Sequence, residues 1–491
     1  MMPYCQTLII GAGPAGLTAA YELANSGASV VVIERDPRYV GGISRTVEHR
    51  GYRFDIGGHR FFSKSEEIEA LWTEILGDEM LQRPRSSRIY YDGKLFDYPL
   101  KPFDALGKLG PIEAARCVLS YLKARAFPQR PATNFEQWVV NNFGRRLFEI
   151  FFRTYTEKVW GMDCAEISAD WAAQRIKGLN LFRAVVSGLG LGKTRKRSEV
   201  IKTQISSFRY PRLGPGQMWE RARDLIVERG GEVRMNTTIT GLRQNGGDGL
   251  WTAQLSTGET ITAEHVISSA PMPELVRLIG ADSDHVVDVA SKALRFRDFV
   301  VVALIVAGEE RFSDNWIYVH DPRVRVGRIQ NFKSWSPHMV PDPATACYGM
   351  EYFCHQTDGF WNMSDRELVA MARREIAELG LAVADDVVEG VVVRQPKAYP
   401  VYDDDYRRNV QVIRDALNER FTNLHLVGRN GMHKYNNQDH AMMTALLTAR
   451  NILAGREIHD PWDVNEDAEY HEGGEATAQR VSERLVPRRA A

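Results

Sequence analysis

The sequence is poor in cysteine and contains no long hydrophobic run. Its 5 cysteines are scattered among 491 residues, without a CxxC pair or the spacing of metal ligands. A disulfide scaffold is therefore excluded, and we predict a reducing compartment and no metal. No stretch of about twenty apolar residues occurs, and the first residues lack a basic segment followed by a signal-length apolar run. We therefore expect no transmembrane segment and a cytoplasmic protein.

Net charge is also nearly absent. The 62 basic and 63 acidic residues give a formal charge of −1, so no global field favours nucleic acid or an anionic membrane as a partner. With 44% hydrophobic and 25% charged residues, the chain is typical of a globular protein of two or three domains. We expect a small-molecule partner, whereas composition does not indicate the oligomeric state.

The clearest motif is TLIIGAGPAGLTAAYELANSGASVVVIERD, at residues 7–36. Its pattern predicts a buried strand, a glycine turn, an amphipathic helix and a second buried strand. Such a unit indicates an α/β fold with a Rossmann-type dinucleotide-binding domain. Gly11 permits the tight turn, Gly13 lets the backbone approach a pyrophosphate, and Gly16 lets helix and strand pack closely.

The end of the second predicted strand carries Glu34 and Arg35. Glu34 has the spacing at which a carboxylate accepts hydrogen bonds from an adenosine ribose, and we place Arg35 in the same cofactor site. An acid at this position disfavours a 2′-phosphate. The ordered strand, helix and acid favour a cofactor site over a fortuitous glycine turn, but NAD and FAD both fit this motif.

The next segment, RYVGGISRTVEHRGYRFDIGGHRFF, separates these two cofactors. Gly41 and Gly42 stand where a second loop can meet a diphosphate, and Gly57, Gly58 and His59 follow a short predicted strand. A nicotinamide enzyme needs no such second loop. The framework resembles the flavoprotein group of amine oxidases, protoporphyrinogen oxidase and UDP-galactopyranose mutase. The resemblance implies FAD, with the last glycine pair near the isoalloxazine; His59 fits either a flavin contact or an ordinary packed histidine.

Later strands predict that the cofactor domain is discontinuous. Strands around Val233 and Val266 return after a long helical excursion, and we place Val233 in the cofactor site. Gly428 and Arg429 lie at a final strand-to-helix turn, which either holds the polar edge of the flavin or is an ordinary loop. The expected parts are an FAD-binding domain at 1–62, 207–290 and 400–456; a mainly helical substrate domain at 63–206, with a mobile basic loop near 187–198; a sheet-rich substrate domain at 291–399; and a C-terminal tail at 457–491.

That basic loop contains SGLGLGKT, which is similar to a phosphate-binding loop. Ser187 stands where the phosphate-loop pattern requires glycine, and no strong strand precedes it. The segment therefore fits either a solvated surface loop or a lid over an anionic ligand.

An aromatic group occurs in FRTYTEKVWG, at residues 152–161. The stretch resembles the uridine-contacting motif of UDP-galactopyranose mutases, which implies that Tyr155 and Trp160 hold the base, Tyr155 by stacking. A planar base needs an apolar face, and aromatic rings supply one at low cost in side-chain entropy. The alternative is a helix that packs these rings into a core.

Two arginines are candidates for a diphosphate site. By resemblance, Arg297 in LRFRDFVVV is a diphosphate ligand, and Arg175 after DWAAQ is a second candidate. Guanidinium groups suit phosphate because two donors meet two oxygens in one plane. Surface or interdomain salt bridges are the alternative for both.

The C-terminal motif departs from the mutase pattern. The resemblance places Tyr435 on a tyrosine that touches the diphosphate region, whereas His433 replaces another family tyrosine and Asn437 replaces an aspartate. We still place Asn437 in the cofactor site. An amide carries no charge, so any electrostatic contribution of that carboxylate is missing. The departure leaves open both the substrate and the reaction.

The resemblance implies an FAD-dependent enzyme that acts on a nucleotide sugar. In that chemistry, N5 of reduced FAD attacks the anomeric carbon and displaces the nucleoside diphosphate. Ring opening and closure of the flavin–sugar adduct then exchange pyranose for furanose. We place His59, Arg297 and Tyr435 at the catalytic centre, and a flavin reductant such as NAD(P)H is a further expected partner. The alternative is an FAD-dependent oxidase or dehydrogenase that transfers hydride from a small molecule to the flavin.

Overall fold

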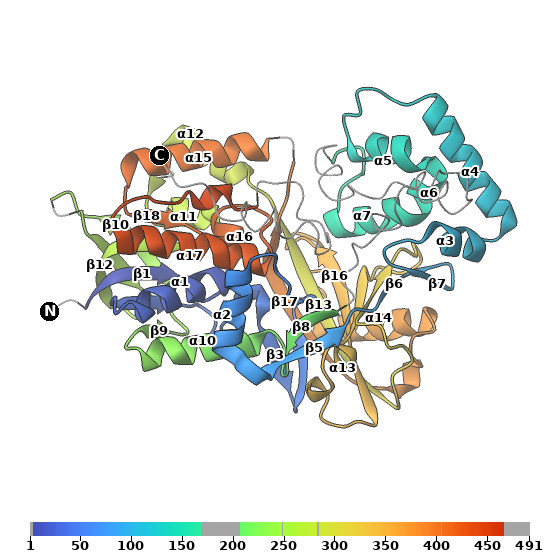
Figure 1. The fold of residues 1–491 in the computed structure, drawn as a ribbon, viewed down its shortest axis with the longest axis horizontal. Helices are drawn as coiled ribbons and strands as arrows, with labels where there is room; N and C mark the ends of the chain where they lie inside the picture. The colour runs from blue at the N-terminus through green and yellow to red at the C-terminus, as the bar shows by residue number, and fades with distance from the viewer. Residues whose placement is uncertain (1–2, 168–206, 248, 282–283, 404, 466–491) are drawn as a thin grey trace.

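The structure is a computed structural model that describes residues 3–167, 207–247, 249–281, 284–403 and 405–465. Figure 1 shows a sheet covered by helices on the left and a second sheet on the right, with a group of helices above the second sheet. The predicted α/β class, with a Rossmann-type FAD-binding domain, an inserted helical part and a sheet-rich part, is confirmed.

The first sheet forms the centre of the dinucleotide-binding part. Its order is β10-β11-β12-β1-β2-β9, and β18 also pairs with β12. Pairs β9–β2, β2–β1, β1–β12 and β12–β18 are parallel, whereas β10 and β11 form an antiparallel extension. The strands are β1 (Tyr4–Ile10), β2 (Val30–Ile33), β9 (Glu232–Arg234), β10 (Ile239–Gln244), β11 (Trp251–Leu255), β12 (Thr260–Ser268) and β18 (Leu424–Leu426).

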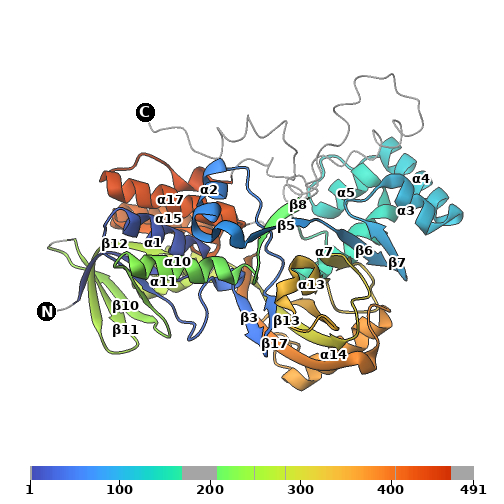
Figure 2. The same ribbon diagram turned by 60° about the horizontal axis from the view of Figure 1, so that its bottom comes forward.

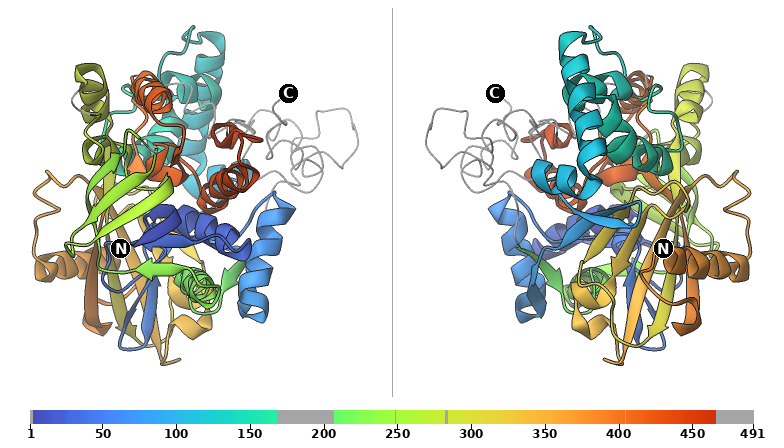
Figure 3. Two further views of the ribbon diagram at one scale, coloured as in Figure 1. Left: turned by 90° about the vertical axis from the view of Figure 1, so that its left-hand side faces the viewer. Right: turned by 90° about the vertical axis from the view of Figure 1, so that its right-hand side faces the viewer.

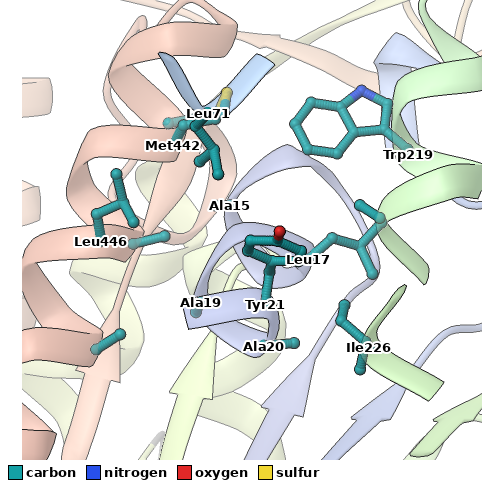
Figure 4. Close-up of a cluster of buried hydrophobic side chains, with 14 of the residues drawn as sticks. Ala15, Leu17, Ala19, Ala20, Tyr21, Leu71, Trp219, Ile226, Met442 and Leu446 are labelled. Carbon is teal, nitrogen blue, oxygen red and sulfur yellow. The ribbon is translucent and has the colours of Figure 1, made fainter. Parts of the chain in front are cut away.

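Helices bury the two faces of this sheet in two hydrophobic clusters. On one face α1 lies against α10 and α17, and the alanines of α1 allow this close approach (Figure 4). The helices on this face are α1 (Pro14–Asn25), α2 (Glu66–Leu76), α10 (Gly216–Glu228) and α17 (Gln438–Ala454). The opposite face is covered by α11 (Met272–Leu278), α12 (His285–Ala293) and α15 (Tyr406–Arg420).

The second sheet has the order β17-β13-β16-β15-β14-β6-β7, with β14 and β6 parallel and the other pairs antiparallel. Helix α14 covers one face, and α13 packs on the other. The elements are β6 (Ser87–Tyr91), β7 (Lys94–Asp97), β13 (Phe296–Ala307), β14 (Trp316–Val319), β15 (Arg328–Asn331), α13 (Phe332–Trp335), β16 (Thr345–Cys354), α14 (Asp365–Glu378) and β17 (Val387–Pro400).

The helical part packs around its own hydrophobic cluster beside the end of the second sheet. A five-residue π-helical turn, Glu149–Arg153, leads directly into α7. Such turns often occur at functional sites, because they change the direction in which the next residues point. The helices are α3 (Pro102–Leu109), α4 (Pro111–Ala126), α5 (Phe135–Phe143), α6 (Arg145–Phe148) and α7 (Thr154–Trp160).

The segment expected as a mainly helical domain, 63–206, is divided among all three parts. Helix α2 packs against α10 and α17, because its apolar face, which includes Ile68 and Trp72, needs their cover (Figure 3). Strands β6 and β7 join the second sheet, and β5 (Met80–Pro84) pairs with β8 (Ser207–Pro211) between the parts (Figure 2). The basic loop near 187–198 lies outside the described residues.

The expected C-terminal tail also begins later than residue 457. Val464 is buried in the cluster beneath α17, and Trp462 packs against the opposite cluster. Apolar side chains within a polar stretch therefore extend the packed structure to residue 465.

Candidate active site

The first glycine turn joins β1 to α1 and requires glycine at two positions. Gly11 has φ +95°, and a Cβ at Gly16 would lie 1.9 Å from the Gly11 carbonyl oxygen. No atom lies within 4 Å of an ideal Cβ at Gly13, which immediately precedes α1. The approach to the positive end of α1 is therefore open, as a diphosphate requires.

Glu34 holds the turn from the end of β2. Its Oε2 accepts a hydrogen bond from the Ala12 N–H at 2.7 Å, and its Oε1 accepts one from the Asp36 N–H at 2.9 Å. A carboxylate has about four acceptor positions, so these bonds leave capacity for ribose hydroxyls. Arg35 points elsewhere, since its guanidinium lies 3.6 Å from the Glu274 carboxylate. Val233 lies in β9, and its side chain packs against the core beneath α1.

The second glycine loop lies directly against the first. The Gly41 N–H donates to the Ala12 carbonyl at 2.7 Å, and a Cβ at Gly42 would lie 3.4 Å from Gly13 Cα. The buried Trp219 indole N–H beside Gly41 has no partner among the described residues. Backbone N–H groups, a helix N-terminus and an unsatisfied buried donor suit a diphosphate, so these residues fit the central part of FAD.

The third glycine region surrounds the N-terminus of α17. Gly428 has φ +79°, and its Cβ would lie 2.9 Å from the Ala15 Cβ, so this turn touches the start of α1. Arg429 Nε donates to the Asn436 carbonyl at 2.9 Å, which fixes the loop before α17. Asn437 is exposed at the helix N-terminus, with its N–H donating to His440 Nδ1 at 3.2 Å.

His59 follows Gly57 and Gly58, and its Nε2 lies 3.7 Å from an ideal Cβ at Gly57. Its Nε2 lies 3.0 Å from the Ile56 carbonyl, and its Nδ1 lies 3.4 Å from the Ser44 hydroxyl. These partners favour a neutral ring that donates from Nε2 and accepts at Nδ1. Burial, together with the charges of Arg429 and Arg328, lowers the pKa of His59 to about 4. The imidazole can therefore orient a ligand as a neutral group near pH 7.

A small aromatic cavity of about 60 Å³ lies between α7, the second sheet and the loop before α17. Its volume is smaller than that of typical small-molecule pockets. The Tyr155 ring stacks on His320 at 4.9 Å, and Trp160 lies 6.4 Å from Tyr435. The cavity is lined by Tyr155, Val159, Trp160, Arg297, Arg328, Phe353, Tyr399 and Tyr435.

Arg297 has a structural task in this cavity. Its Nε donates to the Val159 carbonyl at 2.9 Å, and Nη2 donates to the carbonyls of Lys158 at 3.3 Å and Phe353 at 3.2 Å. A Cβ at Gly161 would lie 2.4 Å from Nη1. The guanidinium thus satisfies carbonyls at the C-terminus of α7. This geometry differs from the expected diphosphate ligand, because much of its donor capacity is already used.

Arg328 is a second buried cation of the cavity, and our sequence reasoning missed it. Its Nε forms a close ion pair with Glu351, and its Nη2 lies 3.7 Å from an ideal Cβ at Gly57. Burial opposes its charge, but Glu351, Tyr155 and neighbouring tyrosines hold the pKa of Arg328 above its ordinary value. No glycine motif or family signature marks RVGRIQN, and only the paired strands bring it to the site.

Tyr399 is the other ring that sequence reasoning missed. It stacks on Tyr435 at 5.7 Å with an interplanar angle of 14°, and Arg429 lies 5.2 Å from both ring centres. It comes from the end of β17, far from every glycine motif. The prolines around AYPVY indicate only a strand end, so the sequence carries no signal for this position.

Lys158 connects α7, the helix that carries Tyr155 and Trp160, to the second sheet by hydrogen bonds. Its Nζ donates to the carbonyls of Asp321 at 2.7 Å, Val326 at 3.1 Å and Val319 at 3.3 Å. Burial lowers the pKa of Lys158 to about 8, although Glu375 and Asp321 act in the opposite direction. The ammonium fixes α7 next to the strand end that carries His320, the stacking partner of Tyr155.

The structure thus brings most predicted residues to one continuous region. The three glycine turns converge at the carboxyl end of the first sheet, where open α/β sheets bind their ligands. The aromatic cavity adjoins them through Gly57 and the Tyr399–Tyr435 pair. Arg175 lies outside the described residues. Assignment of individual residues to cofactor or substrate stays a prediction.

A Rossmann-type sheet with a second glycine loop and an adjoining ligand cavity defines the class of FAD-binding flavoproteins. The chain belongs to the flavin-containing amine oxidoreductase family, whose sequence profile matches residues 14–453. FAD is therefore its cofactor.

Comparison with solved structures identifies a crystal structure of reduced UDP-galactopyranose mutase, with a TM-score of 0.79 and 21% identity over 92% of this chain and 95% of that one. A probable UDP-galactopyranose mutase of Klebsiella pneumoniae is 29% identical over 33% of this chain, a stretch that spans 42% of that protein. Coproporphyrinogen III oxidase of Mycobacterium leprae is 25% identical over 84% of this chain and 91% of its own.

The chain is thus a flavoenzyme of this family, and its relatives include both a mutase and an oxidase. No helix of the described residues has the length and apolar character needed to cross a membrane.

Proposed function

We propose that the protein is an FAD-dependent enzyme of nucleotide-sugar metabolism with pyranose–furanose mutase activity. The observation that carries the proposal is the composition of the aromatic cavity beside Gly57 and Gly58. It combines several aromatic rings with the largely buried guanidinium of Arg328. A nucleoside diphosphate sugar needs both, since its base is planar and its diphosphate is anionic.

In this proposal the base lies against Tyr155 or Trp160. Tyr155 is held by its stack on His320 and by an edge contact with Tyr318 at 5.3 Å, so its ring is already oriented. A preorganised ring loses little conformational entropy on binding. Burial raises the pKa of Tyr155 well above its usual value, so the phenol stays neutral and does not repel an anion.

Arg328 takes the place that our sequence analysis gave to Arg297. Its Nε is paired with Glu351, whereas its Nη1 and Nη2 make no hydrogen bond to any of the described residues. Desolvated guanidinium groups form strong charge-assisted hydrogen bonds to phosphate. Tyr435 at the same wall offers a hydroxyl and a ring face beside the leaving diphosphate.

FAD, when bound and reduced, supplies the nucleophile for mutase chemistry at the anomeric carbon. The residues of the chain then have to hold the sugar next to the flavin and stabilise the departing diphosphate. Neutral His59 would orient the flavin or the sugar by hydrogen bonding without adding a competing charge. A Ser-His-Asp arrangement is not needed for these tasks.

Trapping tests the proposal directly. The FAD-loaded protein is reduced without oxygen, mixed with a panel of nucleotide sugars and treated with cyanoborohydride, and the extracted flavin is weighed by mass spectrometry. Mutase activity predicts flavin that is heavier by one sugar. Unmodified flavin across the panel would reject the mutase proposal.

An FAD-dependent oxidase or dehydrogenase is the second candidate, because of Asn437. This exposed amide stands where the mutase pattern has an aspartate, and the oxidase relative covers more of the chain than the mutase relative. Hydride transfer predicts a small molecule that bleaches the oxidised flavin without added reductant. Bleaching together with unmodified flavin in the trapping experiment would favour this candidate.

A further inference from the structure

The outer face of α4 carries exposed apolar side chains where a surface helix normally carries polar ones. Ile112 is 71% exposed, Leu119 66% and Leu122 55%, and Phe127, just after the helix, is 80% exposed. With 3.6 residues per turn, Ile112, Leu119 and Leu122, together with Val118, fall within an arc of about 120°. Contiguous exposed apolar surface of this kind marks an interaction site.

This arc is directed away from the body of the protein. The buried residues of α4 are Cys117 and Ala124, which fall on the opposite side of the helix. Those residues anchor the helix to its hydrophobic cluster, so the apolar arc has no role in that core. In Figure 1, α4 is the outermost helix of the helical part, far from the dinucleotide sheet.

Basic side chains flank the apolar arc on both sides. On the helix projection, Arg116 and Lys123 border one edge, and Arg125 borders the other. Glu113 is the one acidic residue in 111–127, and its carboxylate is engaged by Arg146 and Arg116. The face is therefore locally cationic, although the whole chain has a net charge of −1.

We propose that the outer face of α4 binds the surface of an anionic lipid bilayer, with the helix lying in the plane of the membrane. Leu, Ile and Phe side chains would enter the interfacial region, while the flanking Arg and Lys side chains reach lipid phosphates. Phe103 on α3, the helix that contacts α4, is also 52% exposed. Docking on a surface needs no membrane-spanning helix.

A second copy of the chain fits this face less well than a bilayer. A two-fold contact through α4 would bring the same basic residues of both copies together, and like charges would repel. An anionic bilayer offers charge of the opposite sign along the whole helix. The outermost position of α4 in Figure 1 also suits a flat surface.

Vesicle co-sedimentation of the full-length, FAD-loaded protein tests the proposal. One set of vesicles contains equal parts of phosphatidylglycerol and phosphatidylcholine, and the other contains phosphatidylcholine alone. We expect at least about tenfold stronger partition onto the anionic vesicles, decreasing with salt. The double variant Leu119→Ser/Leu122→Ser should lose about tenfold or more of this partition.

A matched control uses two exposed valines elsewhere. Val286→Ser/Val289→Ser removes apolar surface from α12, where the side chains are 62% and 53% exposed, and should leave partition unchanged. Both double variants should keep the flavin spectrum and the melting temperature, since the residues are exposed.

Three results would overturn the proposal. The first is that the wild-type protein fails to sediment with the anionic vesicles, or binds phosphatidylcholine vesicles equally well. The second is that the α4 variant partitions like the wild type. The third is that sedimentation velocity shows an oligomer which the substitutions in α4 dissociate, because this face would then be a contact between copies.

Discussion

The dinucleotide-binding part and the aromatic cavity are built in different ways. The first uses three glycine turns, and in each the requirement is local: a positive φ, or a Cβ that would strike a neighbouring backbone. The second uses side chains from α7, from strands β13, β15, β16 and β17, and from the loop before α17, which are distant in sequence. Backbone constraints leave a readable motif, whereas a converging set of side chains does not.

The largest expected effect is a loss of stability that should occur at one glycine of the first turn and not at another. Gly16→Ala should destabilise the protein by roughly 3 kcal/mol or more, because its Cβ would lie 1.9 Å from a backbone carbonyl oxygen. Gly13→Ala should fold normally, since no atom lies within 4 Å of its Cβ, but should retain less FAD because the methyl group stands in the diphosphate approach. Thermal melting and the flavin-to-protein absorbance ratio distinguish these outcomes. Equal melting temperatures for the two variants would refute the packing argument.

The next effect, on stability and UDP binding, concerns the bonds that hold α7, which lines the cavity, to the second sheet. Lys158→Met removes three hydrogen bonds from a buried ammonium and should cost about 2–3 kcal/mol in free energy of unfolding, together with weaker UDP binding. Lys333→Met is the matched control, because Lys333 also donates to two carbonyls, at 2.7 and 3.2 Å, and pairs with Glu310, but does not line the cavity. It should lower stability and leave UDP affinity unchanged. Equal UDP affinities for both variants would deny Lys158 a positioning role.

A smaller effect tests the choice between the two arginines. Arg328→Lys keeps the charge beside Glu351 but loses the forked donor geometry, so UDP binding measured by calorimetry should weaken by about 1–2 kcal/mol. The control Arg323→Lys changes a guanidinium that is 54% exposed and paired with Asp321, and should bind UDP like the wild type. Arg297→Gln should act chiefly on thermal stability, because its guanidinium holds the end of α7. Loss of UDP affinity in Arg297→Gln at unchanged stability would restore the original assignment.

The last effect is a pH dependence of stability in the dinucleotide-binding part. Burial and the neighbouring His265 lower the pKa of His425 to about 4, against about 6.5 in an unfolded chain. Between these values the unfolded state binds more protons, so stability present above pH 6.5 is lost as pH falls toward 4, by up to about 1.4 kcal/mol per pH unit.

Urea unfolding at several pH values measures this slope. His425→Gln should reduce it, whereas His285→Gln at an exposed position should not. An identical slope in His425→Gln and the wild type would exclude His425 as a source of acid sensitivity. UDP affinity at neutral pH should be unaffected, since His425 does not line the cavity.

The same contrast explains what could be predicted from the sequence. The Rossmann unit, the second glycine loop and the discontinuous domain were predictable because Gly11 and Gly41 have a positive φ and Gly16 lies against the Gly11 carbonyl, which are requirements of the local backbone. The extent of the helical part was not predictable, because the amphipathic pattern of α2 does not indicate which neighbouring element covers its apolar face.

The cavity was predictable only in part. Tyr155 and Trp160 share one helix and could be recognised together. Arg328 could not be recognised, because its position depends on the pairing of β15 with β14 and β16. For Arg297, sequence resemblance suggested a ligand contact, whereas the structure shows bonds to the carbonyls that end α7.

A crystal structure of the FAD-loaded protein with UDP tests the central claim most directly. We expect the base against Tyr155 or Trp160 and the diphosphate within hydrogen-bonding distance of Arg328. A diphosphate bound elsewhere, or a cavity without nucleotide at saturating UDP, would contradict the account.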